Sequence, residues 1–239
     1  MLSILELLQG SFSLGFVIIS IIIGLKIMSN YFKHKNRTFL LVGIAWIGLA
    51  NPWMPDSINF LMYLTSETVL NEFTYLLIGN AFIPFFLLCW ITAFTDLKYS
   101  SSQKIFLIIS SIASVIFEIL FFSLLISDTA LIGNSLGPFQ YEFSLFIEIY
   151  LVTVILIVLI TGVLFGLESM KSSERRIKLK GKFIIAAFIL FSLGAIIDSS
   201  VPLTEITVVI TRIILILSSI SFYIGFMFPK FIEKWLIKE

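Results

Sequence analysis

Long apolar stretches recur along the chain and are separated by short polar segments. About 20 mostly apolar residues form a helix that crosses the ~30 Å hydrocarbon layer of a bilayer and satisfies its own backbone hydrogen bonds. Seven stretches are long enough, and they are apolar nearly all round, as helices in lipid are. We therefore predict an all-α, seven-transmembrane helix bundle that forms a single domain over residues 1–239. The predicted spans are residues 7–28, 38–53, 72–94, 104–126, 143–167, 183–201 and 204–228.

The composition independently indicates that the lipid bilayer is the main partner. The 239 residues are 59% apolar and 13% charged, with a mean hydropathy of +1.07. A soluble domain carries about 25% charged residues, so these charges are too few to cover a water-soluble surface. The net charge of +1 produces no overall positive field, and we expect no nucleic-acid partner.

Lysine and arginine residues are confined to alternate connecting segments. Of the 16 basic residues, 15 fall between, or at the adjoining ends of, spans one and two, three and four, and five and six, or after span seven. Basic segments mark the cytoplasmic side, so we expect a multi-pass protein of the cell membrane with its N-terminus extracellular and its C-terminus cytoplasmic. The first apolar run has no basic segment before it and no cleavage site, so we expect a retained span. The 15 residues are Lys26, Lys33, Lys35, Arg37, Lys98, Lys104, Lys171, Arg175, Arg176, Lys178, Lys180, Lys182, Lys230, Lys234 and Lys238.

The remaining basic residue, Arg212, lies inside the seventh span. A guanidinium keeps its charge and is costly in the bilayer core unless it is paired. We predict a bidentate contact with Glu118, Glu148 or both. A rise of 1.5 Å per residue places several polar residues in one layer of the outer half. These candidate ligand-binding residues are Arg212, Glu118, Glu148, Asn80, Asn51 and Asp198.

Two interpretations of this layer remain open. It could line a pocket for a small polar or lipid-derived ligand, or it could be a buried ion pair that fixes helix register and binds nothing. Residues seven apart share one face of a helix, which relates Ser13 to Ser20 in the first span and Arg212 to Ser219 in the last. These stripes predict a polar interior that is open toward the outside.

Two prolines predict breaks within spans. Pro52 follows Asn51 in the second span, and Pro84 lies one turn beyond Asn80 in the third. Proline removes a backbone donor and clashes one turn back, so we expect a kink at each position. Gly162 and the glycine four residues later form a G-x-x-x-G motif that permits close helix approach, either inside the bundle or in a homodimer.

The connection from Lys171 to Lys182 is strongly basic. It could contact anionic lipid, or it could dock a cytoplasmic signalling partner. The chain carries no HExxH, GxSxG or GxxxxGK[ST] motif, and it has one histidine and one cysteine. We therefore expect no catalytic activity, no metal site and no cofactor.

The predicted layout resembles that of microbial rhodopsins, but the seventh span has Arg212 and no lysine. Arginine does not form the retinal Schiff base under ordinary conditions, so covalent retinal is excluded. The exit from this span, from Phe222 to Pro229 followed by Lys230 and Trp235, resembles the seven-transmembrane N-terminal sensor regions of prokaryotic histidine kinases. No kinase domain follows before Glu239, so the resemblance implies a receptor-like module that signals through a separate partner.

Three functions follow as alternatives. The first is a receptor-like sensor that binds a small ligand in the outer polar layer and passes helix shifts to the inner segments. The second is a small-molecule or ion transporter that uses the same charges. The third is a structural or accessory membrane subunit that acts through lateral helix contacts.

Overall fold

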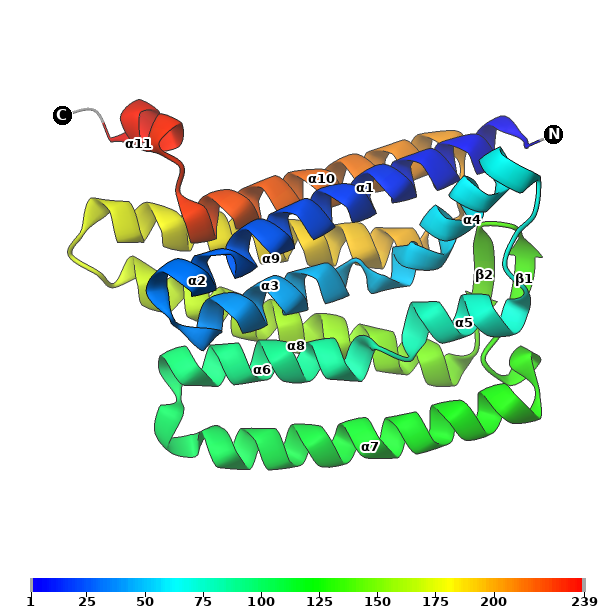
Figure 1. Ribbon diagram of the computed structural model, residues 1–239, viewed down its shortest axis with the longest axis horizontal. Coiled ribbons are helices and arrows are strands. Elements are labelled where there is room, and N and C mark those ends of the chain that lie inside the picture. Colours follow the sequence, from blue (N-terminus) through cyan, green and yellow to red (C-terminus); the bar gives the residue numbers. More distant parts are fainter. Residues whose placement is uncertain (1, 238–239) are drawn as a thin grey trace.

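The computed structural model describes residues 2–237, and Lys238 lies outside the described residues. Helices dominate this part of the chain (Figure 1). The elements are α1 (Ile4–Met28), α2 (Asn30–His34), α3 (Arg37–Leu49), η1 (Asn51–Trp53), α4 (Met54–Ser66), α5 (Glu72–Asn80), α6 (Ile83–Lys98), η2 (Ser100–Ser102), α7 (Gln103–Ser127), η3 (Thr129–Leu131), β1 (Gly133–Gly137), β2 (Gln140–Phe143), α8 (Leu145–Met170), α9 (Arg175–Ser200), α10 (Glu205–Met227) and α11 (Lys230–Leu236).

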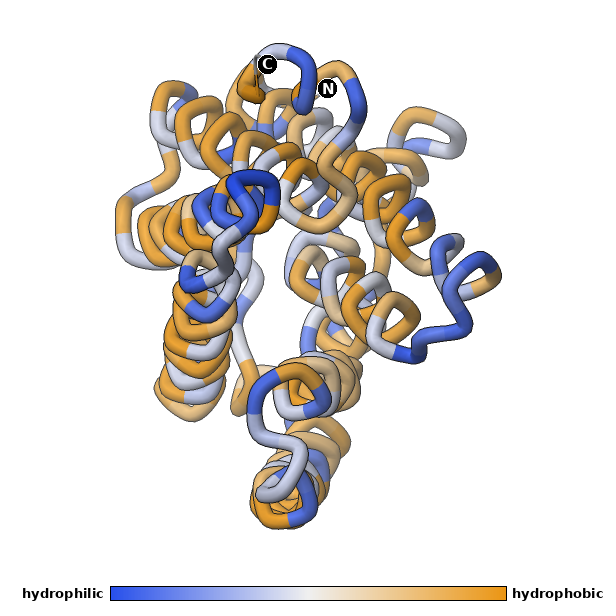
Figure 2. Tube along the Cα trace, turned by 90° about the vertical axis from the view of Figure 1, so that its left-hand side faces the viewer, coloured by the Kyte–Doolittle hydropathy of each residue, from blue (hydrophilic) through white to orange (hydrophobic). Residues whose placement is uncertain are grey.

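Among residues 2–237, six helical segments are long and apolar enough to cross a membrane. A further pair, α3 followed by η1 and α4, passes the same test jointly but bends by 41° at the break. Viewed from the end that carries α2 and α11, the helices are mostly hydrophobic and the hydrophilic residues gather in the connecting segments (Figure 2). The helical prediction is confirmed, and the length and composition are those of a multi-pass membrane protein.

Both proline breaks predicted from the sequence are present. Helix α3 ends at Leu49, and Pro52 lies in the single turn of η1 that redirects the chain into α4. Helix α5 ends at Asn80, and α6 restarts with Pro84 in its first turn. The first turn of a helix tolerates proline because its backbone N–H groups have no partner within the helix.

Six of the long segments close into a ring. Helix α1 packs against α3, α3 against α6, α6 against α8, α8 against α9, α9 against α10, and α10 against α1. Helix α7 stands outside this ring and packs mainly on α6, at the lower edge of Figure 1. Its outward face is apolar and exposed, as a lipid-facing surface is.

One part of the fold departs from the all-α prediction. The turn-rich segment before α8 forms a short antiparallel hairpin, in which Ser135 of β1 pairs with Tyr141 of β2. Side chains of the bundle hold its turn: Gln9 of α1 donates to the carbonyl of Phe139, and Asn59 of α4 donates to that of Pro138 at 2.5 Å. The hairpin therefore covers the end of the bundle that carries the N-terminus (Figure 1).

Glycines bring two pairs of neighbouring helices close together. A Cβ atom on Gly24 would lie 2.7 Å from the carbonyl oxygen of Gly43, so α1 and α3 nearly touch there. A Cβ on Gly166 would lie 2.9 Å from the carbonyl oxygen of Gly181, which joins α8 to α9. Gly162 packs against Phe188 in the same interface. The G-x-x-x-G motif is therefore covered within the chain, and its face is not free for a homodimer contact.

Candidate functional site

Arg212 is fully buried in the N-terminal half of α10, with 1% of its side chain exposed. Its Nη1 atom lies 2.5 Å from Oδ1 of Asp198 on α9. The prediction that Glu118 or Glu148 pairs with Arg212 is therefore wrong. Glu118 is on α7, outside the ring, and Glu148 is an exposed residue in the first turn of α8.

Asp198 is held by three side chains. Besides the ion pair, its Oδ2 atom accepts a hydrogen bond from Nε1 of Trp53 at 2.8 Å, and its Oδ1 atom accepts one from Oγ1 of Thr211 at 3.3 Å. The indole ring of Trp53 also lies 5.6 Å from the Arg212 guanidinium carbon. Charge pairing, hydrogen bonding and cation–π attraction all offset the desolvation of this ion pair.

A second carboxylate extends the network toward α1, α4 and α5. Nε of Arg212 donates to the hydroxyl of Ser13 at 3.2 Å, and that hydroxyl donates to Asp56 at 3.4 Å. The Tyr75 hydroxyl also donates to Asp56, which is 4% exposed. We call the set Ser13, Trp53, Asp56, Tyr75, Asp198, Thr211 and Arg212 the outer polar network, because the sequence predicts that this end of the bundle is extracellular.

Sequence reasoning missed most of this network. Asp56 falls between the predicted spans 38–53 and 72–94, and neither Trp53 nor Tyr75 is among the candidates. The seven-residue spacing shared by α1 and α10 could have identified Ser13 as a neighbour of Arg212, but the sequence carries no comparable signal for Asp56, Trp53 or Tyr75. Ser13 contacts Arg212, and two turns deeper Ser20 lies 3.3 Å from Ser219. These matched stripes identify α1 and α10 as neighbours.

The remaining candidates lie outside the network. The Asn51 amide donates to the carbonyls of Ile78 and Gly79, both at 2.9 Å, and so ties the break in α3–α4 to the end of α5. The Asn80 amide donates to Leu76 within its own helix at 2.9 Å. Glu118 is partly exposed and its Oε2 atom is buried without a hydrogen-bond partner in the described part of the chain. The structure thus brings together Arg212 and Asp198 from the predicted layer.

The network offers groups suited to binding a charged or polar ligand. It contains one guanidinium, two carboxylates and three hydroxyl groups, and it has neither histidine nor cysteine. A buried guanidinium that is already desolvated binds carboxylate or phosphate groups strongly. Within residues 2–237 no group of three or more His, Cys, Asp or Glu side chains is placed to hold a metal ion.

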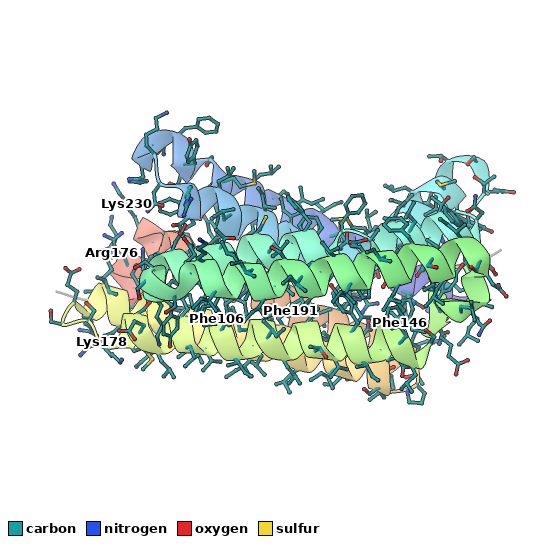
Figure 3. All side chains as sticks on the ribbon, turned by 90° about the horizontal axis from the view of Figure 1, so that it is seen from below. Phe106, Phe146, Arg176, Lys178, Phe191 and Lys230 are labelled. Carbon is teal, nitrogen blue, oxygen red and sulfur yellow. The ribbon has the colours of Figure 1, made fainter. Side chains whose placement is uncertain are left out.

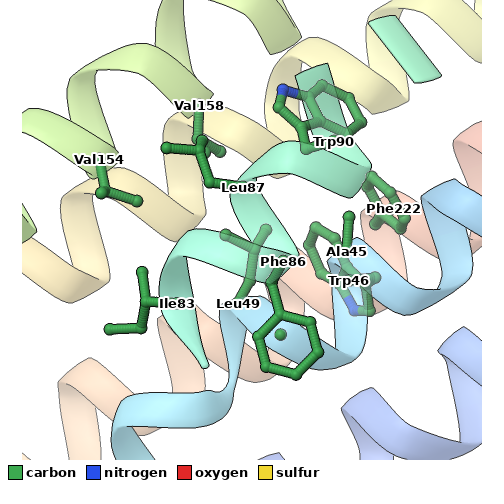
Figure 4. Close-up of a pocket in the computed structure, with 11 residues that line it drawn as sticks. Ala45, Trp46, Leu49, Ile83, Phe86, Leu87, Trp90, Val154, Val158 and Phe222 are labelled. Atoms are coloured by element: carbon green, nitrogen blue, oxygen red, sulfur yellow. The ribbon is translucent and has the colours of Figure 1, made fainter. Parts of the chain in front are cut away.

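Aromatic side chains fill the bundle below the network. Phe222 lies ten residues beyond Arg212 on α10, which is about 15 Å nearer the basic end. Its ring stacks on Trp46 at 3.6 Å between centroids, and Phe188 meets both rings edge-on. Beside this cluster lies a cavity of about 20 Å³ (Figure 4), room for roughly one water molecule. Its lining residues are Ala45, Trp46, Gly48, Leu49, Ile83, Phe86, Leu87, Trp90, Val154, Val158 and Phe222.

No protein-family model matches the chain, and neither a curated protein nor a solved structure is similar to it. The functional argument therefore depends on the geometry of the chain itself.

Proposed function

We propose that the chain crosses the cell membrane seven times, with α3 and α4 counted as one broken span. All the described lysine and arginine residues except Arg212 lie at the end of the bundle that carries α2, α11 and the α8–α9 connection. Arg176, Lys178 and Lys230 mark this end in Figure 3. The positive-inside rule assigns it to the cytoplasm, and the N-terminus and the hairpin to the outside.

We further propose that the protein is a receptor-like sensor whose responsive element is the outer polar network. The observation that carries this proposal is the position of Asp198. It lies two residues before the end of α9, and the following residues, 199–202, are exposed. The side chain of Asp198 is 15% exposed, whereas that of Arg212 behind it is only 1% exposed. The carboxylate thus covers a buried guanidinium close to the outer surface.

A small anion from the outside would compete with Asp198 for Arg212. A carboxylate or phosphate group matches the two-pronged geometry of a guanidinium. Its binding would release α9 from α10 at the outer end and would change the Ser13 contact with α1. The ligand would need different affinities for the two helix arrangements in order to signal.

The inner end offers a route for the output. Arg176 of α9 pairs with Glu233 of α11 at 3.3 Å, and Arg175 donates to the carbonyl of Leu236 at 3.1 Å. A shift of α9 or α10 would therefore move α11 and the basic connection from Lys171 to Lys182. We propose that this surface docks the cytoplasmic signalling partner. The aromatic packing of Trp46, Phe188 and Phe222 below the network supports sensing over transport of a polar solute.

A reporter on the inner surface tests this function. Cys89→Ser removes the single cysteine, and Ser173→Cys introduces a site for an environment-sensitive fluorophore in the exposed α8–α9 connection. In nanodiscs, formate, acetate, succinate or inorganic phosphate is added at constant ionic strength. We expect a saturable fluorescence change with at least one of these anions and its loss in Arg212→Lys, which keeps the charge but not the fork geometry.

The matched control is Arg37→Lys. It makes the same substitution in the ion pair of Arg37 with Asp96, where the arginine side chain is 63% exposed. An unchanged signal in Arg212→Lys, or no response to any of the four anions, would contradict an anion-responsive network. Uptake of a responding anion into proteoliposomes would instead establish transport.

A further inference from the structure

The two glycine contacts are the same contact made twice. A Cβ atom on Gly24 would meet Cγ1 of Ile47 and the carbonyl oxygen of Gly43. A Cβ on Gly43 would meet Cγ of Met28 and the carbonyl oxygen of Gly24. These atoms belong to α1 and α3.

Helices α8 and α9 repeat this arrangement atom for atom. A Cβ on Gly166 would meet Cγ1 of Ile185 and the carbonyl oxygen of Gly181, and a Cβ on Gly181 would meet Cγ of Met170 and the carbonyl oxygen of Gly166. Glycine and methionine are four residues apart in both first helices, and glycine and isoleucine are four apart in both second helices. The chain directions also agree, because α1 and α8 both run toward the basic end (Figure 1).

The order of the ring extends the match to three helices. A half-turn about an axis along the bundle places α1, α3 and α6 on α8, α9 and α10, because the ring runs α1, α3, α6, α8, α9, α10. Helices α3 and α9 then lie opposite each other, and side chains of the α3–η1 segment meet those of α9 in the centre, where Trp46 contacts Phe188 and Trp53 of η1 contacts Phe191. Helix α7 lies between the two sets in sequence and outside them in space.

We propose that the chain consists of two equivalent three-helix units, and that the cavity of Figure 4, which lies between them, is a binding site for a small uncharged molecule. Helices α3 and α6 of the first unit and α8 and α10 of the second line this cavity. Secondary transporters built from parallel repeats place their substrate sites at the interface of the repeats, near the midplane, and we apply the same geometry to this cavity. This site is separate from the outer polar network.

The lining selects the chemistry of the ligand. Trp46, Trp90 and Phe222 present aromatic surface, and no ionisable side chain borders the cavity. A cavity with an apolar and aromatic lining favours a ligand that is compact, uncharged and mostly apolar.

Two seams join the units, and α6 packs on α8 much less extensively than α1 packs on α10, so entry follows the α6–α8 seam. The α1–α10 seam is held by the contact of Arg212 with Ser13 and by that of Ser20 with Ser219. The α6–α8 seam has the Trp90–Thr161 hydrogen bond at 2.7 Å and, at the basic end, the partly exposed Lys98–Glu168 ion pair at 3.3 Å. Separation at α6–α8 enlarges the cavity and connects it to the lipid phase.

Cysteine accessibility tests the site and its entrance. In the Cys89→Ser background, Val158→Cys places a thiol in the cavity wall on α8, and Val42→Cys places one at an equally buried site on α3 outside the cavity. Both valines are 1% exposed. The reagents are methyl methanethiosulfonate, which is uncharged, and its anionic sulfonatoethyl analogue. Reaction of a buried thiol requires local opening.

We expect the uncharged reagent to modify Val158→Cys at least about tenfold faster than Val42→Cys, because the seam opens locally. The anionic reagent should modify Val158→Cys much more slowly than the uncharged reagent does. Val154→Cys, on the same wall, replaces Val158→Cys if that variant does not fold. Equal rates at the cavity and control positions would overturn the entrance, and equal rates with both reagents would overturn the selection of an uncharged ligand.

Discussion

Arg212 of α10 donates a hydrogen bond to Ser13 of α1 across 199 residues of sequence, at 3.2 Å. This contact joins the first and last long helices of the ring at the depth of the buried ion pair. It makes the stability of the bundle end that carries the N-terminus depend on a few charged groups, so substitutions in the network should have measurable effects on stability.

The ion pair between Arg212 and Asp198 should be strongly coupled. Arg212→Ala leaves Asp198 with its hydrogen bonds from Trp53 and Thr211 but without a cation. Asp198→Ala leaves the guanidinium buried without a counter-charge. Each single change should cost about 3 kcal/mol, because removing one partner of a buried pair strands the other. Thermal unfolding in nanodiscs measures the loss, and the double variant should lose much less than the two single losses added together. Simple additivity would show that the two side chains do not interact.

Two tryptophans provide a matched test of hydrogen bonding. Trp53→Phe keeps an aromatic ring but removes the donor to Asp198, so it should destabilise the protein by about 1–3 kcal/mol. Trp46→Phe removes a donor that has no partner among the described residues, so its cost should be smaller despite the similar loss of ring volume. Thermal unfolding of both variants measures the difference. A larger loss for Trp46→Phe than for Trp53→Phe would contradict this assignment of hydrogen bonds.

The glycine contacts should tolerate no added methyl group. Gly24→Ala and Gly166→Ala both force a Cβ against a backbone carbonyl and an isoleucine side chain. Each should destabilise by about 1–3 kcal/mol, as overpacking does. Gly15 of α1 has nothing within 4 Å of its ideal Cβ, and Gly15→Ala should instead stabilise the helix by up to about 1 kcal/mol. Apparent melting temperatures measure all three, and similar values for the three variants would refute close packing at the glycines.

Membrane orientation is testable with an impermeant thiol reagent on intact cells. In the Cys89→Ser background, Ser135→Cys lies on the exposed hairpin and Ser173→Cys on the exposed α8–α9 connection. We expect Ser135→Cys to react in intact cells and Ser173→Cys to react only after permeabilisation. The opposite pattern would reverse the proposed orientation and place the outer polar network on the cytoplasmic side.

Local features of the fold were predictable from the sequence. Pro52 and Pro84 locate the two breaks because the effect of proline is confined to about one helical turn. The length of the apolar stretches predicted the long helices, since lipid demands complete backbone pairing within each span. The hairpin was not predicted, because residues 132–138 are rich in turn formers and carry little of the alternating pattern that identifies strands.

The partner of Arg212 was not predictable from depth alone. Glu118 and Arg212 lie at similar estimated depths, but depth does not determine which helices are neighbours. Helix α7 packs on α6 outside the ring, so Glu118 cannot reach α10. Asp198 was a member of the predicted layer, and only the adjacency of α9 and α10 identified it as the counter-ion.

The position of α7 has a consequence for how the polypeptide inserts. A unit of three spans ends on the side of the membrane opposite to its start. Two such units joined directly would therefore have opposite orientations in the membrane. One additional crossing restores the direction of the second unit. In the proposed seven-span arrangement helix α7 supplies this crossing, and its span length and apolarity should therefore matter more to biogenesis than the identity of any side chain on its lipid-facing surface.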